Sequence, residues 1–232
     1  MLPEQQIIYR PFVFIVDSPS HDDLYNGAYS IGMALRDSLR AIKIPCFYTI
    51  ATSYEHFSSA LMNGLPSAIS QMQDYYREAF PKIESVPLVH LCMHGAPEGI
   101  GLTDKSFILW DSLRNLFVAH NQIKGYSPYI CMASCNGFSG TSMATAFDRA
   151  FSILVGNNGT IYQSVLTVGY MSFYHHLINN NASFEQAVLA MRCASGDGNF
   201  FYTHGDHVRN HLFAELESKT FNNVWQNPQP GW

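Results

Sequence analysis

The chain has 232 residues, of which 47% are hydrophobic and 13% charged, and its formal net charge is −5 at pH 7. This length and composition predict a globular domain with a substantial core and exclude the disordered class. Scattered Lys and Arg residues argue against nucleic-acid binding, and the absence of a long apolar run and of a signal-peptide pattern predicts a cytoplasmic protein without membrane insertion.

Apolar, β-branched runs that stop at turn residues predict strands buried on both faces. In chain order these runs cover residues 11–17, 44–50, 86–94, 126–134 and 151–156, and a last strand is expected around 200–202. The segments 100–104 and 107–110 predict a short hairpin between the third strand and the fourth.

Helices are predicted between these strands from apolar positions that recur every three or four residues. The first runs from Leu24 to Ile42, with Asp22 or Asp23 near its positively polarised N-terminus. The second covers 54–80 with a break near 64–66, and the third follows the cap residue Asp111. Further helices are expected around 143–150, from 164 onward, and from the capping box of Ser183 and Gln186 through Met191. A tail rich in Pro and Asn follows.

This alternation of strands and helices predicts a single α/β domain over residues 1–232. We expect a three-layer sandwich in which helices cover both faces of a mostly parallel sheet. The core is expected to span about 12–202, and residues 203–232 form a C-terminal extension.

Two predicted strands end in residues that can do chemistry together. The third strand ends in His94-Gly95, and the fourth leads into Ser134-Cys135-Asn136-Gly137. The carboxyl ends of parallel strands meet at one edge of a sheet, about 4.8 Å apart. An imidazole beside a thiol can take its proton and create a nucleophile, and the backbone N–H groups of Gly95 and Cys135 could form an oxyanion hole.

The five cysteines are odd in number and follow no regular spacing, so we expect reduced thiols and no disulfide framework. Cys46, Cys92 and Cys131 have apolar neighbours and are interpreted as core thiols. Cys193 is the fifth.

The motifs "CMHG" and "MASCNG", with "GIGLTD" and "LWDSLRNLF" between them, resemble the caspase-like cysteine peptidases of clan CD, especially bacterial CHAT-domain and caspase-like effectors. The likeness covers roughly residues 12–202. It implies a caspase-like sandwich and hydrolysis of a protein or peptide substrate, with Cys135 as nucleophile and His94 as general acid and base. It implies no metal and no cofactor.

The resemblance also places the specificity pocket near residues 17–23 and Ser134, so Asp22, Asp23 and Ser134 are candidate substrate-binding residues. No arginine occupies that loop, which argues against the acidic-residue preference of true caspases. By analogy, the chain is an effector in antiviral defence or regulated cell death. It shows no sensor of its own, so we expect a regulatory partner.

Three alternatives stay open. The chain could be a catalytically silent caspase-like module that only binds partners. The segment "SGTSMAT" resembles the nucleophile motif of subtilisin-like peptidases, with Ser142 as nucleophile and Asp17 and His94 as partners, although too few residues separate His94 from Ser142 for that fold. His207 and His211, with His204 nearby, have a spacing that can bind zinc, but no carboxylate lies between them. The histidines at 120, 175 and 176 are expected at the surface or rim.

Overall fold

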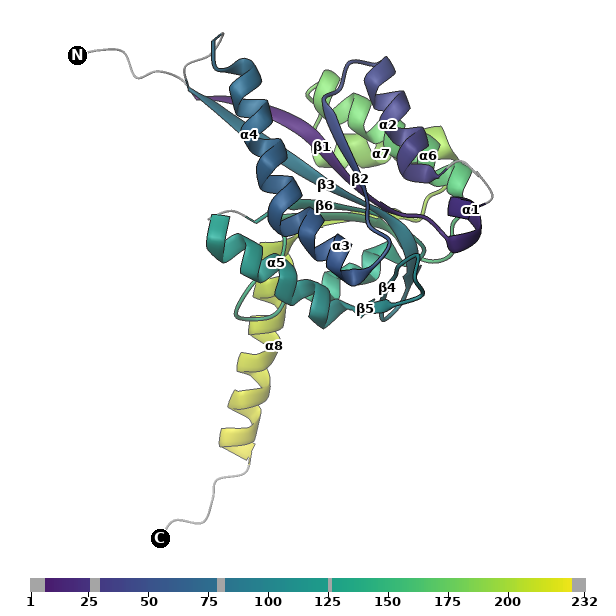
Figure 1. The fold of residues 1–232 in the computed structure, drawn as a ribbon. Helices are drawn as coiled ribbons and strands as arrows, with labels where there is room; N and C mark the ends of the chain where they lie inside the picture. The colour runs from purple at the N-terminus through teal and green to yellow at the C-terminus, as the bar shows by residue number, and fades with distance from the viewer. Residues whose placement is uncertain (1–6, 26–29, 79–81, 125–126, 227–232) are drawn as a thin grey trace, which may run out of the picture.

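The computed structural model describes residues 7–25, 30–78, 82–124 and 127–226. Its sheet has the strand order β2-β1-β3-β6-β7-β8, and the hairpin strands β4 and β5 attach to the end of β3 (Figure 1). The strands are β1 (Ile8–Ser18), β2 (Cys46–Ile50), β3 (Ile83–Ala96), β4 (Gly99–Gly101), β5 (Phe107–Leu109), β6 (Tyr129–Ala133), β7 (Ile153–Asn157) and β8 (Phe200–His204). The neighbours from β2 to β7 pair in parallel, and β8 runs antiparallel to β7.

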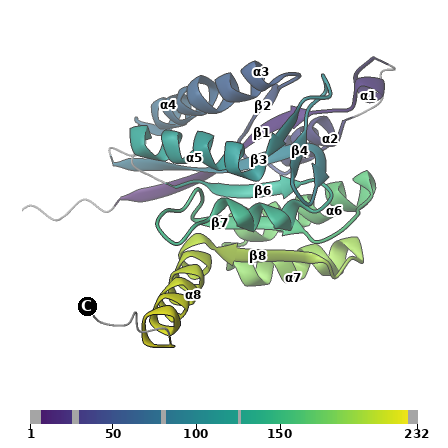
Figure 2. The same cartoon turned by 90° about the horizontal axis from the view of Figure 1, so that it is seen from below.

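Helices cover both faces of this sheet (Figure 2). One face carries α2 (Ile31–Ala41), α6 (Gln163–Tyr174) and α7 (Phe184–Ser195), and the other carries α3 (Tyr54–Ser59), α4 (Leu65–Tyr76) and α5 (Trp110–Lys124). The remaining helices are α1 (His21–Tyr25), α8 (Gly205–Gln226), the 3-10 helix η2 (Gly137–Met143) and the π-helical turns η1 (Ala60–Gly64) and η3 (His175–Asn179). The predicted three-layer α/β sandwich with a mostly parallel sheet is therefore confirmed.

The central strands are apolar throughout because each face of the sheet has its own core. In β3, Val89 and Leu91 face α3, α4 and α5, whereas Leu88 and Cys92 face α2, α6 and α7. Successive side chains of a strand point to opposite faces. This alternation fixes the face on which each side chain at the strand ends lies.

The predicted break at residues 64–66 is wrong, because the helix continues without interruption from α3 through η1 into α4. Pro66 stands in the first turn of α4. A proline lacks the N–H of a regular helical turn and its ring crowds the preceding turn. The wider π-helical turn directly before it lets the chain pass this proline without stopping.

The helix predicted around 143–150 is also wrong. Residues 137–143 form η2 instead, and the next residues form a turn in which the side chain of Thr145 accepts from the backbone N–H groups of Phe147 and Asp148. Such local side-chain bonds offer the backbone an alternative to a helix. The Asp148 carboxylate is held in turn by Arg114 of α5, with 2.9 Å between Nη2 and Oδ2.

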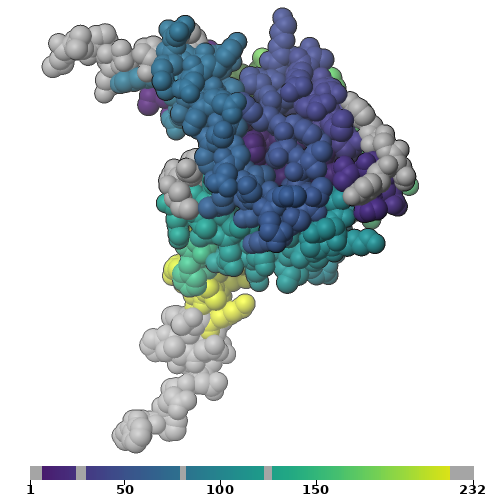
Figure 3. Space-filling model, in the orientation of Figure 1, coloured from purple at the N-terminus to yellow at the C-terminus, as the bar shows by residue number. Residues whose placement is uncertain are grey.

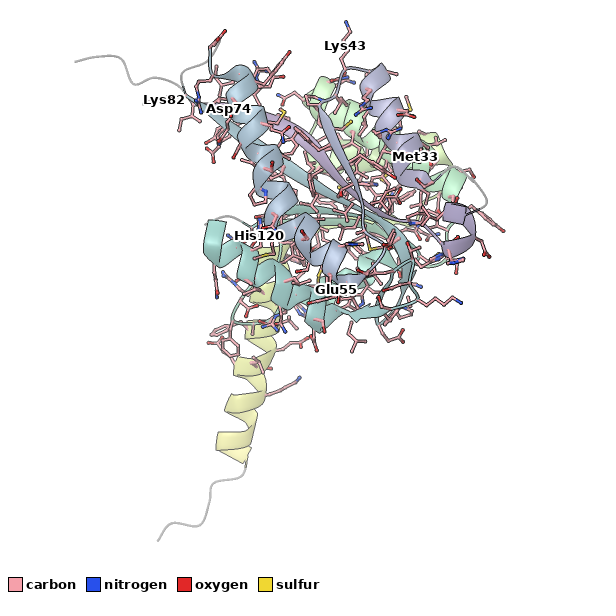
Figure 4. All side chains as sticks on the ribbon, viewed as in Figure 1. Met33, Lys43, Glu55, Asp74, Lys82 and His120 are labelled. Atoms are coloured by element: carbon pink, nitrogen blue, oxygen red, sulfur yellow. The ribbon has the colours of Figure 1, made fainter. Side chains whose placement is uncertain are left out.

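Two further expectations need correction. Asp22 and Asp23 lie in the short α1, and α2 is capped instead by Ser30, whose side chain accepts from the N–H of Met33. His120 on α5, labelled in Figure 4, is 2% exposed and thus not a surface residue. The extension expected after 203 contains the long helix α8, which projects from the body of the molecule (Figure 1).

Candidate active site

His94 lies where β3 leaves the main sheet. The parallel register between β3 and β6 ends with the pair Cys92 and Ala133; His94 follows two residues later in β3, and Cys135 follows two residues after the end of β6. Cys92 and Ala133 belong to the core on the face that carries α2 and α6, and both line one pocket with His94 and Cys135. The two predicted residues therefore meet at one edge of the sheet and on the same side of it.

Gly95 brings the two motifs into direct backbone contact. A Cβ atom at this position would overlap the carbonyl oxygen of Cys135 and would lie 2.8 Å from the side-chain atoms of Ser134. Only a residue without a side chain allows this approach. The glycine after His94 thus allows β3 to lie directly against the segment that carries Cys135.

The backbone turns sharply after Cys135. Asn136 has a positive φ of 52°, in the left-handed region, and its N–H donates to the carbonyl of Gly159 at 2.8 Å. The half-buried thiol of Cys135 donates to the carbonyl of Ile161, with 3.8 Å between Sγ and O. Both bonds anchor the Cys135 turn to the loop between β7 and α6.

A pocket of about 280 Å³, which we call the rim pocket, opens at this edge. Both His94 and Cys135 line it. The remaining wall comes from the segment after β1, the start of α2, the ends of β3 and β6, and the start of α6: Asp17, Ser18, Pro19, Ser20, Asp23, Ser30, Ile31, Cys92, Met93, Ala133, Ser134, Ile161, Tyr162, Gln163 and Leu166. Tyr162 is 82% exposed, so its ring stands at the mouth.

Asp17 is the buried acid of the rim pocket. It is 1% exposed, and its Oδ2 accepts from the Ser30 hydroxyl at 2.6 Å and from the Tyr48 hydroxyl at 2.9 Å. Burial raises the pKa of the Asp17 carboxyl, and these two hydrogen bonds oppose the rise. Gly32 makes the arrangement possible, because a Cβ there would lie 2.5 Å from Oδ2.

The structure brings two of the three candidate substrate-binding residues together. Asp23 and Ser134 line the rim pocket, whereas Asp22 lines a second pocket that shares His94 and Ser20 with it. Ser134 is 2% exposed and its Oγ has no hydrogen-bond partner among the described residues. Sequence reasoning did not single out Tyr162, since an aromatic residue in a loop carries no motif.

The residues of the alternative sites lie elsewhere. Ser142 is in η2, where its hydroxyl donates to the carbonyl of Ser139 at 2.7 Å, and it does not line the rim pocket. His207 and His211 lie on α8, where His211 Nδ1 is 3.5 Å from Glu215 Oε1. Within the described ranges, no group of three or more His, Cys, Asp or Glu residues could hold a metal ion.

Among the helices described, none is long and apolar enough to cross a membrane.

Comparison with known proteins identifies a similar structure but no sequence family. No protein-family model matches the sequence, and no curated protein matches it. Among solved structures, the chain is similar to the X-ray structure of a secreted C11 cysteine protease from Bacteroides thetaiotaomicron, "iotapain", with 10% sequence identity and a TM-score of 0.49. The match covers 92% of this chain and 72% of that one. Similarity at this level assigns no activity to the present chain.

Proposed function

We propose that the chain is a cysteine endopeptidase in which Cys135 is the nucleophile and His94 the general acid and base. The observation that supports this proposal is that His94 and Cys135 both line the rim pocket, where Gly95 lies against the Cys135 carbonyl and the Ser134 side chain. An accessible thiol beside an imidazole is the minimum that nucleophilic catalysis by cysteine requires.

The reaction proceeds in two halves. His94 accepts the thiol proton of Cys135, and the sulfur attacks the carbonyl carbon of the scissile peptide bond. The tetrahedral intermediate collapses when the C–N bond breaks and His94 returns the proton to the leaving amine, which leaves a thioester on Cys135. Water then attacks the thioester, gives a proton to His94, and releases the acid product and the thiol.

Backbone N–H groups of Gly95 and Cys135 supply the oxyanion hole in this proposal. Each donor of this kind contributes about 3 to 4 kcal/mol to the stability of the transition state. The tight contact between the two segments supports the role, because donors must already be in place when the negative charge develops. The acyl part of the substrate occupies the rim pocket, beside Asp17 and Asp23.

The substrate in this proposal is a protein or peptide, and the wider assignment is that of a caspase-like effector. The His-Gly and Ser-Cys motifs support that likeness. A role in bacterial defence or regulated cell death, in the cytoplasm and under a regulatory partner, completes the proposal. Expression of the chain in bacterial cells tests the role, because growth arrest by the wild type and not by Cys135→Ala is expected.

The activity is tested by incubating the purified chain with a peptide library and identifying the products by mass spectrometry. Cys135→Ala is expected to lower the cleavage rate by about a thousandfold or more, since the covalent route is lost. Ser142→Ala and Cys193→Ala are matched controls that keep the rim pocket intact, and both should cleave as the wild type does.

Loss of cleavage in Ser142→Ala alone would show that Ser142 is the nucleophile, as in the subtilisin-like alternative. Cleavage that persists in both Cys135→Ala and His94→Ala would contradict the proposal. A chain that cleaves nothing, and whose Cys135 reacts with iodoacetamide no faster than the exposed Cys193, would instead be the silent binding module.

A further inference from the structure

His94 lines two pockets, and Cys135 lines only one of them. The second pocket, which we call the hairpin pocket, has a volume of about 270 Å³ and is lined by Ser20, His21, Asp22, His94, Leu102, Thr103 and Lys105. Cys135 lines the rim pocket but not the hairpin pocket. Figure 3 shows α1 in purple directly above the teal hairpin, at the margin of the molecule where this pocket lies.

The walls of the hairpin pocket are tied together by hydrogen bonds. Thr103 donates its N–H to Ser18 Oγ at 3.0 Å and its hydroxyl to the Pro19 carbonyl at 2.7 Å. The N–H of Asp104 donates to the carbonyl of Thr52 at 3.0 Å. The loop between β4 and β5 is therefore fixed to the segment after β1 and to the loop after β2, so this pocket is formed before a ligand arrives.

Lys105 gives this pocket a cation. The residue has a positive φ of 70°, and its N–H donates to the Leu102 carbonyl at 3.0 Å, so the turn fixes its backbone. The neighbouring Asp104 carboxylate accepts instead from the N–H and the hydroxyl of Ser106, at 2.9 and 2.6 Å. The one acid that lines the pocket, Asp22, lies 3.8 Å from His21 Nδ1. Over the described residues, no carboxylate forms an ion pair with Lys105.

The two pockets correspond to the two halves of a cleaved peptide. Once Cys135 holds the acyl half in the rim pocket, the amine half must leave from a position where His94 can protonate it. The hairpin pocket also borders His94 and does not include Cys135. Its lining includes the Ser20 hydroxyl and the cation of Lys105, which suit a negatively charged side chain.

We propose that the hairpin pocket binds the residues that follow the scissile bond, and that Lys105 selects an acidic side chain among them. This inference rests on the proposed function, because it takes Cys135 as the point of attack. It names Lys105 as a specificity-determining residue and the hairpin pocket as the subsite for the leaving half of the substrate.

The test uses binding, so it does not depend on turnover. The Cys135→Ala chain, labelled with ¹⁵N, is titrated with the tetrapeptide amides Glu-Ala-Gly-Ser and Lys-Ala-Gly-Ser, which represent leaving halves. We expect saturable shifts of the Thr103 and Lys105 amide signals, and binding of the glutamate peptide about threefold to tenfold tighter than that of the lysine peptide, as one exposed ion pair allows. Lys105→Glu should reverse this order.

Lys43→Glu is the matched control, because it changes the net charge equally and Lys43 projects from a part of the molecule remote from α1 and the hairpin (Figure 4). It should leave the preference unchanged. Equal affinities for the two peptides, or an equal effect of Lys43→Glu, would overturn the inference.

The same binding data separate this inference from the proposed function. An acidic preference in a chain that cleaves no peptide would overturn the peptidase and leave the hairpin pocket as a binding site for acidic peptides only. Cleavage that depends on Cys135, without any effect of Lys105→Glu on either binding or the residue after the cut, would overturn only the subsite.

Discussion

The chain carries the same pair of residues twice, once in its core and once at its rim. His90 and Cys131 are register partners on β3 and β6, and four residues later in each segment come His94, still in β3, and Cys135, just after β6. The first pair lies on the face covered by α2 and α6, and the second lines the rim pocket together with Cys92 and Ala133 of that face. His90 is 0% and Cys131 1% exposed, whereas His94 is exposed and Cys135 lines the rim pocket.

Their surroundings give the two pairs different chemistry. His90 Nδ1 lies 2.8 Å from the Tyr174 hydroxyl, and its ring meets Tyr170 edge-on with 4.5 Å between centroids. Burial lowers the pKa of His90 to about 3 and raises the pKa of Cys131 to about 12. Neither residue is charged at neutral pH, so no thiolate forms in the core. Position at the end of the strand, not residue type, makes the second pair a candidate for catalysis.

The largest expected difference between the pairs is in thiol reactivity. With iodoacetamide at pH 7.5, we expect Cys135 of the folded chain to react at least about a thousandfold faster than Cys131, because a thiol with a pKa near 12 and no access to solvent supplies almost no thiolate. Peptide mass spectrometry over time gives both rates, with the exposed Cys193 as reference. If Cys131 reacted as fast as Cys193, burial would not protect the core thiol, and the expected difference between the two pairs would be wrong.

The two histidines should differ next in their effect on stability. His90→Ala is expected to lower the free energy of unfolding by about 2 to 4 kcal/mol, because it opens a cavity and removes the partner of the Tyr174 hydroxyl. His94→Ala removes an exposed side chain and should change it by less than about 0.5 kcal/mol. Urea denaturation measures both. Equal losses would show that the rim histidine also holds the fold together.

The pH dependence of stability sharpens the comparison further. Below a pH of about 6.5, histidine in the unfolded chain binds a proton that buried His90 does not bind until the pH falls near 3. Stability from this residue is therefore complete above pH 6.5 and is lost as the pH falls. We expect a loss of about 1.6 kcal/mol between pH 6.5 and 5.

Urea denaturation at several pH values, compared between His90→Gln and His94→Gln, isolates this contribution. In a plot of the free energy of unfolding against pH, His90→Gln should lose the part of the slope that His90 contributes, and His94→Gln should keep it. A slope that His90→Gln leaves unaltered would assign the acid sensitivity to other groups.

Part of this molecule could be predicted from the sequence because local patterns determine it. The apolar runs of β1, β3, β6 and β7 predict central strands since each is buried on both faces, and the Ser183 and Gln186 capping box marks the start of α7. The helix around 143–150 could not be excluded from its pattern, because the bond from Arg114 that holds the turn comes from another helix.

Some residues of the candidate site could likewise be predicted from the sequence, and others could not. His94 and Cys135 could be proposed because each follows its own strand. The hydrogen bonds of Asp17 with Ser30 and Tyr48, and the pocket that Lys105 shares with His94, depend on segments that are distant in the sequence. Short sequence motifs carry no information about contacts between distant segments, so these contacts are seen only in the folded structure.

Three glycines around Cys135 are constrained by space alone. A Cβ at Gly95 would overlap the Cys135 carbonyl, one at Gly137 would lie 2.7 Å from the Met132 carbonyl, and one at Gly156 would lie 2.6 Å from the backbone of Gly137. Gly95 lies in β3, Gly137 at the start of η2 after β6, and Gly156 in β7, so the three form a spaced signature in which a side chain has no room, whatever reaction the chain catalyses. A sequence search that demands this signature together with the histidine and the cysteine would recover distant relatives that the individual motifs are too short to detect.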